Sequence, residues 1–325
     1  MSNREIIASN LVKRYGDFTA VNGVSFKVQS GEVFGFLGPN GAGKSTTVNM
    51  LTTLGIPTDG TATVGGYDVI KNAGDVRRVA GVALQEIGLD PIMKSMELLT
   101  IQGQTFGMSR KQARQRAEEL LELVKLSEFK DRRVGNYSGG MRRRLDLALA
   151  LVHEPEILFL DEPTTGLDPA SRRDVWQEVR RLNRSRGMTI FLTTQYLEEA
   201  DELADRIAII DRGEIVAEGK PADLKAEVGG EAINVTFHDI DDVESAKSEL
   251  HGMVDRIQVD RQTLRLYLSN AAASVPKVVQ KLQSAGIELE TLTLTQPTLD
   301  DVFLKVTGQR YDADGETIEA ELHAV

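Results

Sequence analysis

The order of hydrophobic and polar positions predicts a mixed α/β chain. Residues 24–28 alternate apolar and polar side chains, as a half-buried strand does. Glu32–Leu37 follows as a second strand, and a glycine-rich turn separates it from a helix that begins near Lys44. Further apolar runs have the length of buried strands; they are Ile157–Leu160, Thr189–Thr193 and Ile207–Ile210. Strands and helices thus succeed one another as they do in an α/β fold.

A helix-rich stretch interrupts this pattern between about residues 92 and 152. Within it, residues 109–126 are predicted to form an amphipathic helix. Ser109 and Gln112 form a capping-box pattern that marks its start. The apolar residues that share one face of this helix are Ala113, Ala117, Leu120, Leu121 and Val124. A later helix is predicted to begin after Asp168, an N-cap residue followed by a proline, and to end at Gly187.

After about Gly219 the pattern changes. Strands are predicted at residues 232–237, 254–259, 264–268 and 287–295, and helices at 243–250 and 275–285. This β-α-β-β-α-β order is the split βαβ, or ferredoxin-like, pattern. We therefore predict a first domain at residues 5–220 and a smaller α+β domain at 221–308, of accessory or regulatory function. Residues 309–325 hold five acidic residues, and we expect them to form a disordered tail.

The composition is that of an ordinary globular protein with room for two domains. The chain has 325 residues, of which 41% are hydrophobic and 27% charged. It has no cysteine, which excludes disulfides and thiolate metal sites. Its four histidines are scattered without the spacing of metal ligands.

Charge and hydropathy bear on the location and partners of the protein. No apolar run approaches the roughly 18 residues of a membrane helix, and the N-terminus lacks the apolar core of a signal peptide. We therefore expect a cytoplasmic protein whose membrane role, if any, comes through a partner. The net charge is −11, and residues 221–325 carry 19 acidic and nine basic residues. Neither part has a basic excess, so nucleic acid is not expected as a partner.

The residues Gly38 to Ser45 fit the phosphate-loop pattern, between a predicted strand and a predicted helix. Its glycines let the backbone curl so that N–H groups point at a phosphate, and the helix N-terminus adds positive potential. Lys44 is expected to reach the β- and γ-phosphates, and the Ser45 hydroxyl to ligate Mg²⁺. The spacing and context make an ordinary glycine-rich turn a much poorer interpretation.

Two acids end the buried strand at Ile157–Leu160. Asp161 and Glu162 would lie where open α/β sheets bind their ligands, at the carboxyl ends of the strands. We expect Asp161 to hold the Mg²⁺ shell and Glu162 to polarise the attacking water. Two acids in a solvated turn would be the alternative, but the phosphate loop upstream favours the catalytic interpretation.

The segment Tyr137-Ser138-Gly139-Gly140-Met141 narrows the choice among nucleotide hydrolases. Here the sequence resembles the ABC ATPases, whose common signature is Leu-Ser-Gly-Gly-Gln. The chain departs from it at Tyr137 and Met141 but keeps the central Ser-Gly-Gly. Two glycines before a helix form an anion site with no anion in its own subunit. In this family, that site completes the ATP site of a second subunit.

Other family positions match in order across residues 5–220. Tyr15 corresponds to the adenine-stacking aromatic, Gln85 to the Mg²⁺-sensing glutamine, and Gly166 to Asp168 to the dimer-contact loop. Gln195 stands at the switch, where most members have histidine. The catalytic residues implied are Glu162, Gln195 and Lys44, and the metal ligands are Ser45, Gln85 and Asp161. The implied nucleotide contacts are Tyr15, Gly38, Pro39, Asn40, Gly41, Ala42, Gly43, Lys44, Ser45, Thr46, Gln85, Ser138, Gly139, Gly140 and Asp168.

A closer resemblance lies in three segments, Tyr137–Leu145, Leu192–Asp201 and Gln296–Phe303. They are similar to the daunorubicin-resistance type of ABC ATP-binding subunit, whose members belong to drug and antibiotic exporters of bacteria and archaea. The resemblance implies an ATPase that uses ATP and Mg²⁺ and drives a separate permease from the cytoplasmic face of the membrane. The same resemblance implies pairing with a second ATP-binding subunit, expected to be an identical copy. It also implies an α/β P-loop ABC domain with a RecA-like core, an antiparallel β subdomain and a helical subdomain.

Two other functions remain as alternatives. A non-transport ABC ATPase acting on nucleic acid or ribosomes is disfavoured by the single cassette, the acidity and the lack of a long coiled-coil insert. A hydrolytically dead binding module is disfavoured because Lys44, Asp161, Glu162 and the Ser-Gly-Gly core are all present. The basic run Arg142 to Arg144 is expected to support the signature helix rather than to contact nucleic acid.

Overall fold

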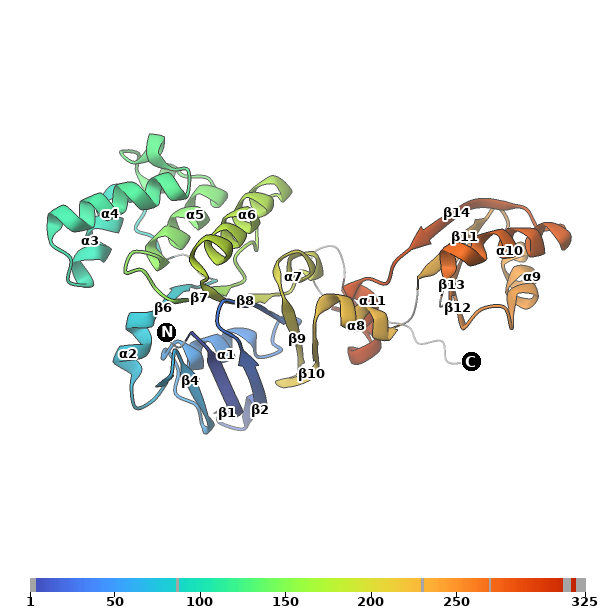
Figure 1. Ribbon diagram of the computed structural model, residues 1–325, viewed down its shortest axis with the longest axis horizontal. Coiled ribbons are helices and arrows are strands. Elements are labelled where there is room, and N and C mark those ends of the chain that lie inside the picture. Colours follow the sequence, from blue (N-terminus) through green and yellow to red (C-terminus); the bar gives the residue numbers. More distant parts are fainter. Residues whose placement is uncertain (1–3, 86–87, 229–230, 269, 312–316, 320–325) are drawn as a thin grey trace. The chain divides into compact units, whose positions relative to one another are not determined.

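The computed structural model describes residues 4–311 and 317–319, apart from 86–87, 229–230 and 269 (Figure 1). The chain divides into two compact units, a first that extends to Pro221 and a second from Ala222 to Arg310. The division lies next to the boundary predicted at residue 220. Within the described residues, no helix is both long enough and apolar enough to cross a membrane.

A six-stranded sheet forms the centre of the first unit, with strand order β10-β9-β3-β8-β7-β6. The strands are β3 (Val33–Leu37), β6 (Ala80–Ala83), β7 (Ile157–Asp161), β8 (Thr189–Thr194), β9 (Arg206–Asp211) and β10 (Glu214–Gly219). All pair in parallel except β10, which is antiparallel to β9. Every residue of β3, β7 and β8 is buried, and their sequences are largely apolar, as is usual for strands covered on both faces. Register pairs Leu37 and Asp161 with adjacent residues of β8, so three carboxyl ends meet at one edge.

A four-stranded antiparallel sheet of order β2-β1-β4-β5 packs against one face of the parallel sheet. Its strands are β1 (Ile6–Tyr15), β2 (Phe18–Val28), β4 (Asp59–Val64) and β5 (Tyr67–Asp68). Phe26 of this sheet contacts Phe34, Phe36 and Phe191 with ring centroids 5.5–5.7 Å apart. The helices α1 (Lys44–Leu51) and α2 (Ala73–Val79) lie on the same side (Figure 1).

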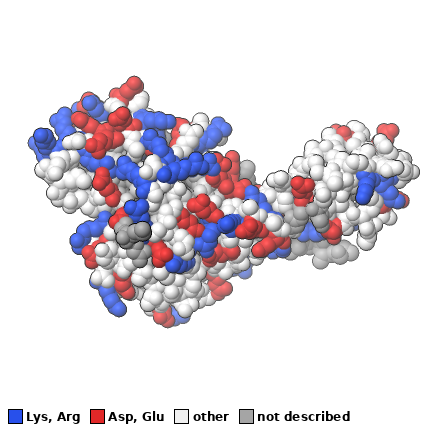
Figure 2. Space-filling view, in the orientation of Figure 1, with Lys and Arg blue, Asp and Glu red and all other residues white. Residues whose placement is uncertain are grey.

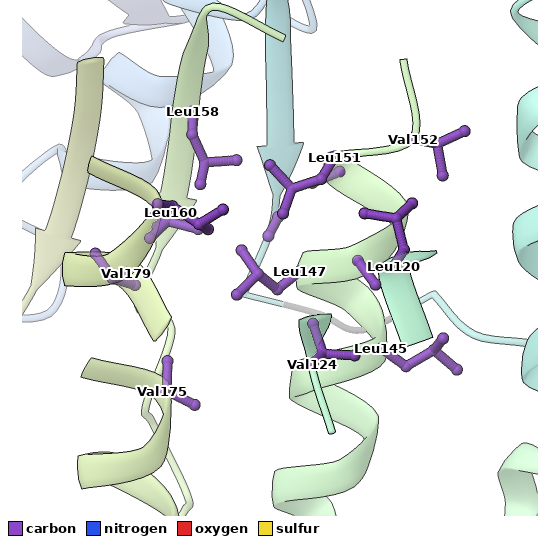
Figure 3. Close-up of a cluster of buried hydrophobic side chains, with 14 of the residues drawn as sticks. Leu120, Val124, Leu145, Leu147, Leu151, Val152, Leu158, Leu160, Val175 and Val179 are labelled. Carbon is purple, nitrogen blue, oxygen red and sulfur yellow. The ribbon is translucent and has the colours of Figure 1, made fainter. Parts of the chain in front are cut away.

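Further helices gather on the other face of the parallel sheet (Figure 1). They are α3 (Ser95–Thr105), α4 (Arg110–Leu123), α5 (Gly139–Ala150), α6 (Pro169–Arg186) and α7 (Leu197–Leu203). Ser109 and Gln112 form the predicted capping box, and Asp168 and Gly187 cap α6 as predicted. Figure 3 shows the core that joins the helices to β7; it includes Leu120, Val124, Leu145, Leu147, Leu151, Leu158, Leu160, Val175 and Val179. Because α5 belongs to this core, its position is tied to that of the sheet.

The second unit has a four-stranded antiparallel sheet of order β12-β13-β11-β14. Its elements are α8 (Pro221–Val228), β11 (Ala232–Phe237), α9 (Ile240–Leu250), β12 (Arg256–Asp260), β13 (Thr263–Tyr267), α10 (Ala271–Ser284), β14 (Leu289–Thr295) and α11 (Leu299–Thr307). The elements from β11 to β14 follow the predicted β-α-β-β-α-β order, and the sheet order is that of a ferredoxin-like fold. Its apolar core is separate from those of the first unit.

The segment after residue 308 differs from the expected disordered tail where it is described. Residues Gln309–Tyr311 (β15) and Thr317–Glu319 (β16) pair in a two-stranded sheet. Backbone pairing satisfies N–H and C=O groups regardless of side-chain charge, so acidic composition alone did not reveal it. The expectation for residues 312–316 and 320–325 falls outside the described residues.

Candidate nucleotide-binding site

A cavity of about 450 Å³ lies at the start of α1. The residues that line it are Tyr15, Phe18, Ala20, Asn40, Gly41, Gly43, Lys44, Ser45, Thr46, Gln85 and Glu162. Nine of these eleven were predicted from the sequence, from segments up to 147 positions apart. The sequence analysis missed Phe18 and Ala20. Phe18 is 64% exposed, and it pairs across the strands with Tyr15, whose ring is half exposed. Two exposed aromatic rings at one cavity suit the stacking of a planar base.

The phosphate loop needs glycine at two positions for steric reasons. A Cβ at Gly38 would lie 2.3 Å from the Ile210 carbonyl oxygen, so no side chain fits there. Gly43 has a φ of 105°, and a Cβ on it would lie 2.5 Å from the Ala20 oxygen. Because Gly43 is also the N-cap of α1 and offers no side chain, the first N–H groups of that helix keep their capacity to bind an anion.

Lys44 is buried and holds the loop in its curled form. Its Nζ donates to the carbonyl oxygens of Gly38 at 2.7 Å and Pro39 at 3.0 Å. It also forms an ion pair with Glu162, with Nζ 3.1 Å from Oε1 and both side chains at most 4% exposed. Burial lowers the pKa of Lys44, and the charge of Glu162 opposes that shift. The ammonium is thus a buried positive charge beside the loop.

Glu162 adopts a backbone conformation that side chains rarely take. Its φ is 47°, in the left-handed region, and its N–H donates to both oxygens of Thr193, at 3.1 Å and 3.0 Å. Gln85 Nε2 donates to Glu162 Oε2 at 3.1 Å. Left-handed non-glycine residues persist where surrounding contacts hold them, and they concentrate at functional sites. The strand end therefore presents the carboxylate in one fixed direction.

The residues predicted to hold Mg²⁺ have suitable chemistry and position. Ser45 Oγ lies 3.2 Å from Asp161 Oδ1, which also accepts a hydrogen bond from Thr193 Oγ1. Since the Gln85 amide nitrogen donates to Glu162, the amide oxygen is the atom left to ligate a cation. Hydroxyl, carboxylate and amide oxygens are hard ligands of the kind Mg²⁺ takes, together with water and phosphate oxygens. The donor set therefore fits the ion.

Gln195 follows β8 and does not line the cavity. It is 6% exposed, and its Oε1 has no hydrogen-bond partner among the described residues. Buried polar atoms are nearly always paired, so an orphaned amide oxygen beside a nucleotide site is the kind of atom that a bound group would satisfy. Asp161 likewise does not line the cavity, but it reaches it through Ser45.

The signature residues lie at the N-terminus of α5, outside the cavity of their own subunit. Ser138 is the N-cap and accepts a hydrogen bond from Met141 N at 3.3 Å. A Cβ at Gly140 would lie 2.8 Å from Ser171 Oγ, so the Ser171 side chain of α6 would have to move to admit one. Tyr137, the departure from the common signature, is buried, and its hydroxyl donates to Phe129 O at 2.8 Å. That hydroxyl also lies 3.0 Å from Ser95 Oγ, which ties the signature to α3.

Asp168 is exposed and caps α6 rather than lining the cavity. Its Oδ1 accepts hydrogen bonds from the N–H groups of Ala170 and Ser171, each at 3.0 Å. The Ser171 hydroxyl donates to the other carboxylate oxygen, and these bonds hold the pKa of Asp168 below its usual value. Three further predicted residues do not line the cavity; they are Gly38, Pro39 and Ala42, which are buried parts of the phosphate loop.

This geometry is that of a P-loop ATPase of the ABC class. A family model described as "ABC transporter" matches residues 21–165, and one described as "ATP-binding protein DrrA1-3-like, C-terminal domain" matches residues 219–307. The chain is 45% identical to the daunorubicin resistance ATP-binding protein DrrA3 of Streptomyces coeruleorubidus, over 95% of this chain and 97% of that protein. The chain therefore belongs to the daunorubicin-resistance family of ABC transporter ATP-binding proteins.

Other relatives and solved structures agree with this assignment. The chain is 40% identical to the linearmycin resistance ATP-binding protein LnrL of Bacillus subtilis, over 93% of this chain and 98% of that protein. It is 41% identical to a Nod factor export ATP-binding protein of Burkholderia lata, over 92% of this chain and 96% of that protein. A dimeric post-hydrolysis structure of the cassette MJ0796 bound to ADP and phosphate is 28% identical, with a TM-score of 0.61 over 66% of this chain and 98% of that one.

Proposed function

We propose that this chain hydrolyses Mg-ATP as one of two paired subunits and drives a separate membrane permease from the cytoplasmic face. The observation that carries the proposal is the grouping of Lys44, Ser45, Gln85 and Glu162 at one cavity, while Ser138 to Gly140 lie outside it. The names of its relatives concern drug resistance and export, which supports efflux of drugs, antibiotics or other lipophilic compounds. They favour this function over action on nucleic acid or ribosomes.

The contacts of Lys44 suggest how binding prepares the site for hydrolysis. Its ammonium is shared between two carbonyl oxygens and Glu162. A bound phosphate group carries more negative charge than the two carbonyl oxygens and the Glu162 carboxylate, so it competes with them for the ammonium. When Lys44 turns to phosphate, Glu162 Oε1 loses its ion-pair partner and becomes free to accept a proton from water.

The remaining residues bind and orient. Tyr15 and Phe18 are placed to stack on adenine, and the α1 N-terminus receives the phosphates. Ser45, Asp161 and Gln85 are assigned to Mg²⁺, which would neutralise developing charge on the transferred phosphoryl group. Gln195 Oε1 has no partner within the part of the chain that the structure describes, and we assign to it a hydrogen bond from the attacking water.

A second subunit would complete the site. The N-terminal end of α5, with Ser138 and Gly139 exposed, presents N–H groups and a hydroxyl to an anion outside its own subunit. Asp168 is also exposed and is assigned to the dimer contact. On the face shown in Figure 2, Lys and Arg intermingle with Asp and Glu over the first unit, without one continuous basic surface. Pairing by specific contacts suits this surface better than general attraction to a polyanion.

The replacement Glu162→Gln tests the catalytic part of this proposal. A general base contributes about 10²–10⁴-fold in rate, so turnover should fall by that order while ATP binding persists. ATP should then hold the variant as a dimer, which analytical ultracentrifugation measures. The exposed neighbour of the switch, Glu198, gives the matched control Glu198→Gln, which should hydrolyse ATP at the parental rate.

Two results would contradict the proposal. Parental turnover by Glu162→Gln would show that Glu162 is not the base. Full specific activity in monomers, at concentrations below those at which dimers form, would show that each subunit is complete by itself. For the transport part, the native protein should co-purify with an integral-membrane subunit, whereas recovery with ribosomes or nucleic acid would support the alternative.

A further inference from the structure

Arg143 is a buried arginine in the middle of α5, five positions after Ser138. Only 4% of the residue is exposed, and its guanidinium donates hydrogen bonds to three backbone carbonyl oxygens. They belong to Leu84 at 2.5 Å, Asp161 at 2.9 Å and Pro163 at 2.8 Å. Two of these residues flank Glu162 and the third precedes Gln85, so one side chain reaches both segments that supply the base and its amide partner.

The arrangement is poorly explained as a device for stability alone. Arg143 Nη1 pairs with Asp146 Oδ2 at 3.1 Å, and the Asp146 side chain is 16% exposed. Burial raises the pKa of Asp146 to about 6 against the opposing charge of Arg143, and burial lowers the pKa of Arg143. The free energy that a buried ion pair gains from attraction hardly offsets the free energy of lost hydration. Well-packed apolar residues can often replace such a pair without a loss of stability. What only arginine supplies here is a rigid planar set of N–H donors.

The backbone at Glu162 is one that needs such donors. Its left-handed φ of 47° turns the chain sharply between Asp161 and Pro163. The guanidinium binds the carbonyls on both sides of this turn, and so fixes the direction of the carboxylate that leaves it. By holding Leu84 it also fixes the residue before Gln85, whose amide donates to Glu162 at 3.1 Å.

We propose that Arg143 is a positioning residue for ATP hydrolysis, which holds the backbone around Glu162 and before Gln85 so that the base faces the attacking water. Arg143 is not among the residues that line the cavity, and it acts on the site through the three backbone carbonyls. The proposal rests on the proposed function of Glu162 as the base. Its signature is a loss of turnover with little change in nucleotide affinity, because the residues that line the cavity remain.

The test removes the buried charges together, with Arg143→Met and Asp146→Leu in one chain, so that no unpaired charge is left inside. Misplacement of a catalytic group by about 1 Å costs up to roughly 10²-fold, so kcat should fall about 10- to 100-fold. The Kd for Mg-ATP, measured by titration calorimetry, should change by less than about threefold. Tm should fall, because three carbonyl oxygens lose their donor, so the comparison of kcat with Kd is the readout that decides. Arg143→Lys should give an intermediate kcat, because an ammonium lacks the planar fork that binds three carbonyls.

Arg144→Met is the matched control, since Arg144 lies on the same helix and donates one hydrogen bond, to Val124 O at 3.2 Å. Its kcat should stay at the parental level. A double variant with parental kcat would overturn the proposal, and so would a parallel loss of kcat, ATP affinity and Tm in both the double variant and Arg143→Lys. If the double variant fails to fold, Arg143→Lys decides alone by the same comparison of kcat with Kd. Parental turnover by Glu162→Gln would instead refute the base, while an inactive Glu162→Gln beside a fully active double variant would refute the positioning role only.

Discussion

Replacing Gln195 with alanine should separate catalysis from stability. The side chain is almost completely buried, and its Oε1 has no hydrogen-bond partner among the described residues. An unpaired buried polar atom destabilises a fold by about 1–3 kcal/mol, which the alanine variant would recover. Deletion of the side chain also removes a buried methylene, which destabilises by about 1 kcal/mol. The free energy of unfolding should therefore be unchanged or rise by up to about 2 kcal/mol.

Turnover should respond in the opposite direction. If Gln195 Oε1 holds the attacking water, its removal should lower kcat by at least about 10-fold, because positioning dominates phosphoryl transfer. Gln195→His should keep activity and acquire a pH dependence near the histidine pKa of about 6.5, since histidine changes charge there and glutamine does not. The assays are urea unfolding and pH–rate profiles of the three proteins at saturating Mg-ATP.

Two results would refute this reasoning about Gln195. An alanine variant as fast as the parent would show that Gln195 is a bystander and that Glu162 needs no partner at this position. A variant destabilised by more than about 2 kcal/mol would show that the amide is part of the packing rather than a catalytic group kept at the expense of stability.

Two further predictions concern the signature and the domain boundary. Tyr137→Phe removes the hydroxyl that binds Phe129 O and leaves that buried contact unmade, so urea unfolding should show a loss of about 1–3 kcal/mol with the Kd for ATP unchanged; equal stability would mean that the hydroxyl contributes nothing. A chain that ends at Lys220 should still bind ATP by calorimetry, because every residue that lines the cavity precedes that point; a folded truncation that no longer binds ATP would show that the site needs the second unit.

The parts of this structure that the sequence predicts best are those whose causes are local. The phosphate loop and the start and end of α6 depend on residues a few positions apart, and glycine, proline and N-cap residues mark them directly. Asp161, the last residue of β7, and Glu162 were predictable because they follow an apolar run of strand length.

The sequence analysis missed one irregular strand and one short helix near the C-terminal end of the second unit. β1 was missed because bulges and the positive φ of Asn10 break the two-residue alternation along it. α11 was missed although Thr298 and Asp301 form a capping box that could have revealed it.

Long-range contacts could not be predicted at all. The basic run Arg142 to Arg144 was expected only to support the signature helix, yet Arg143 binds carbonyls 59, 18 and 20 positions away. Nothing near Arg143 in the sequence distinguishes it from its two neighbours, because the burial that makes it different comes from tertiary packing.

The position of Arg143 has a consequence for the proposed pair of subunits as a whole. Arg143 lies five positions after Ser138, which is exposed at the helix N-terminus. About 7.5 Å of rigid helix therefore joins the surface proposed to meet the partner's nucleotide to the carbonyls around Glu162. A movement of α5 toward the nucleotide bound by the partner subunit would therefore also shift the carbonyls around Glu162, the base for the nucleotide bound by its own subunit. Such linkage is reciprocal in binding free energy, so ATP at either site should change the affinity of its counterpart by the same factor, and the two sites of the dimer should behave as a cooperative pair rather than as two independent enzymes.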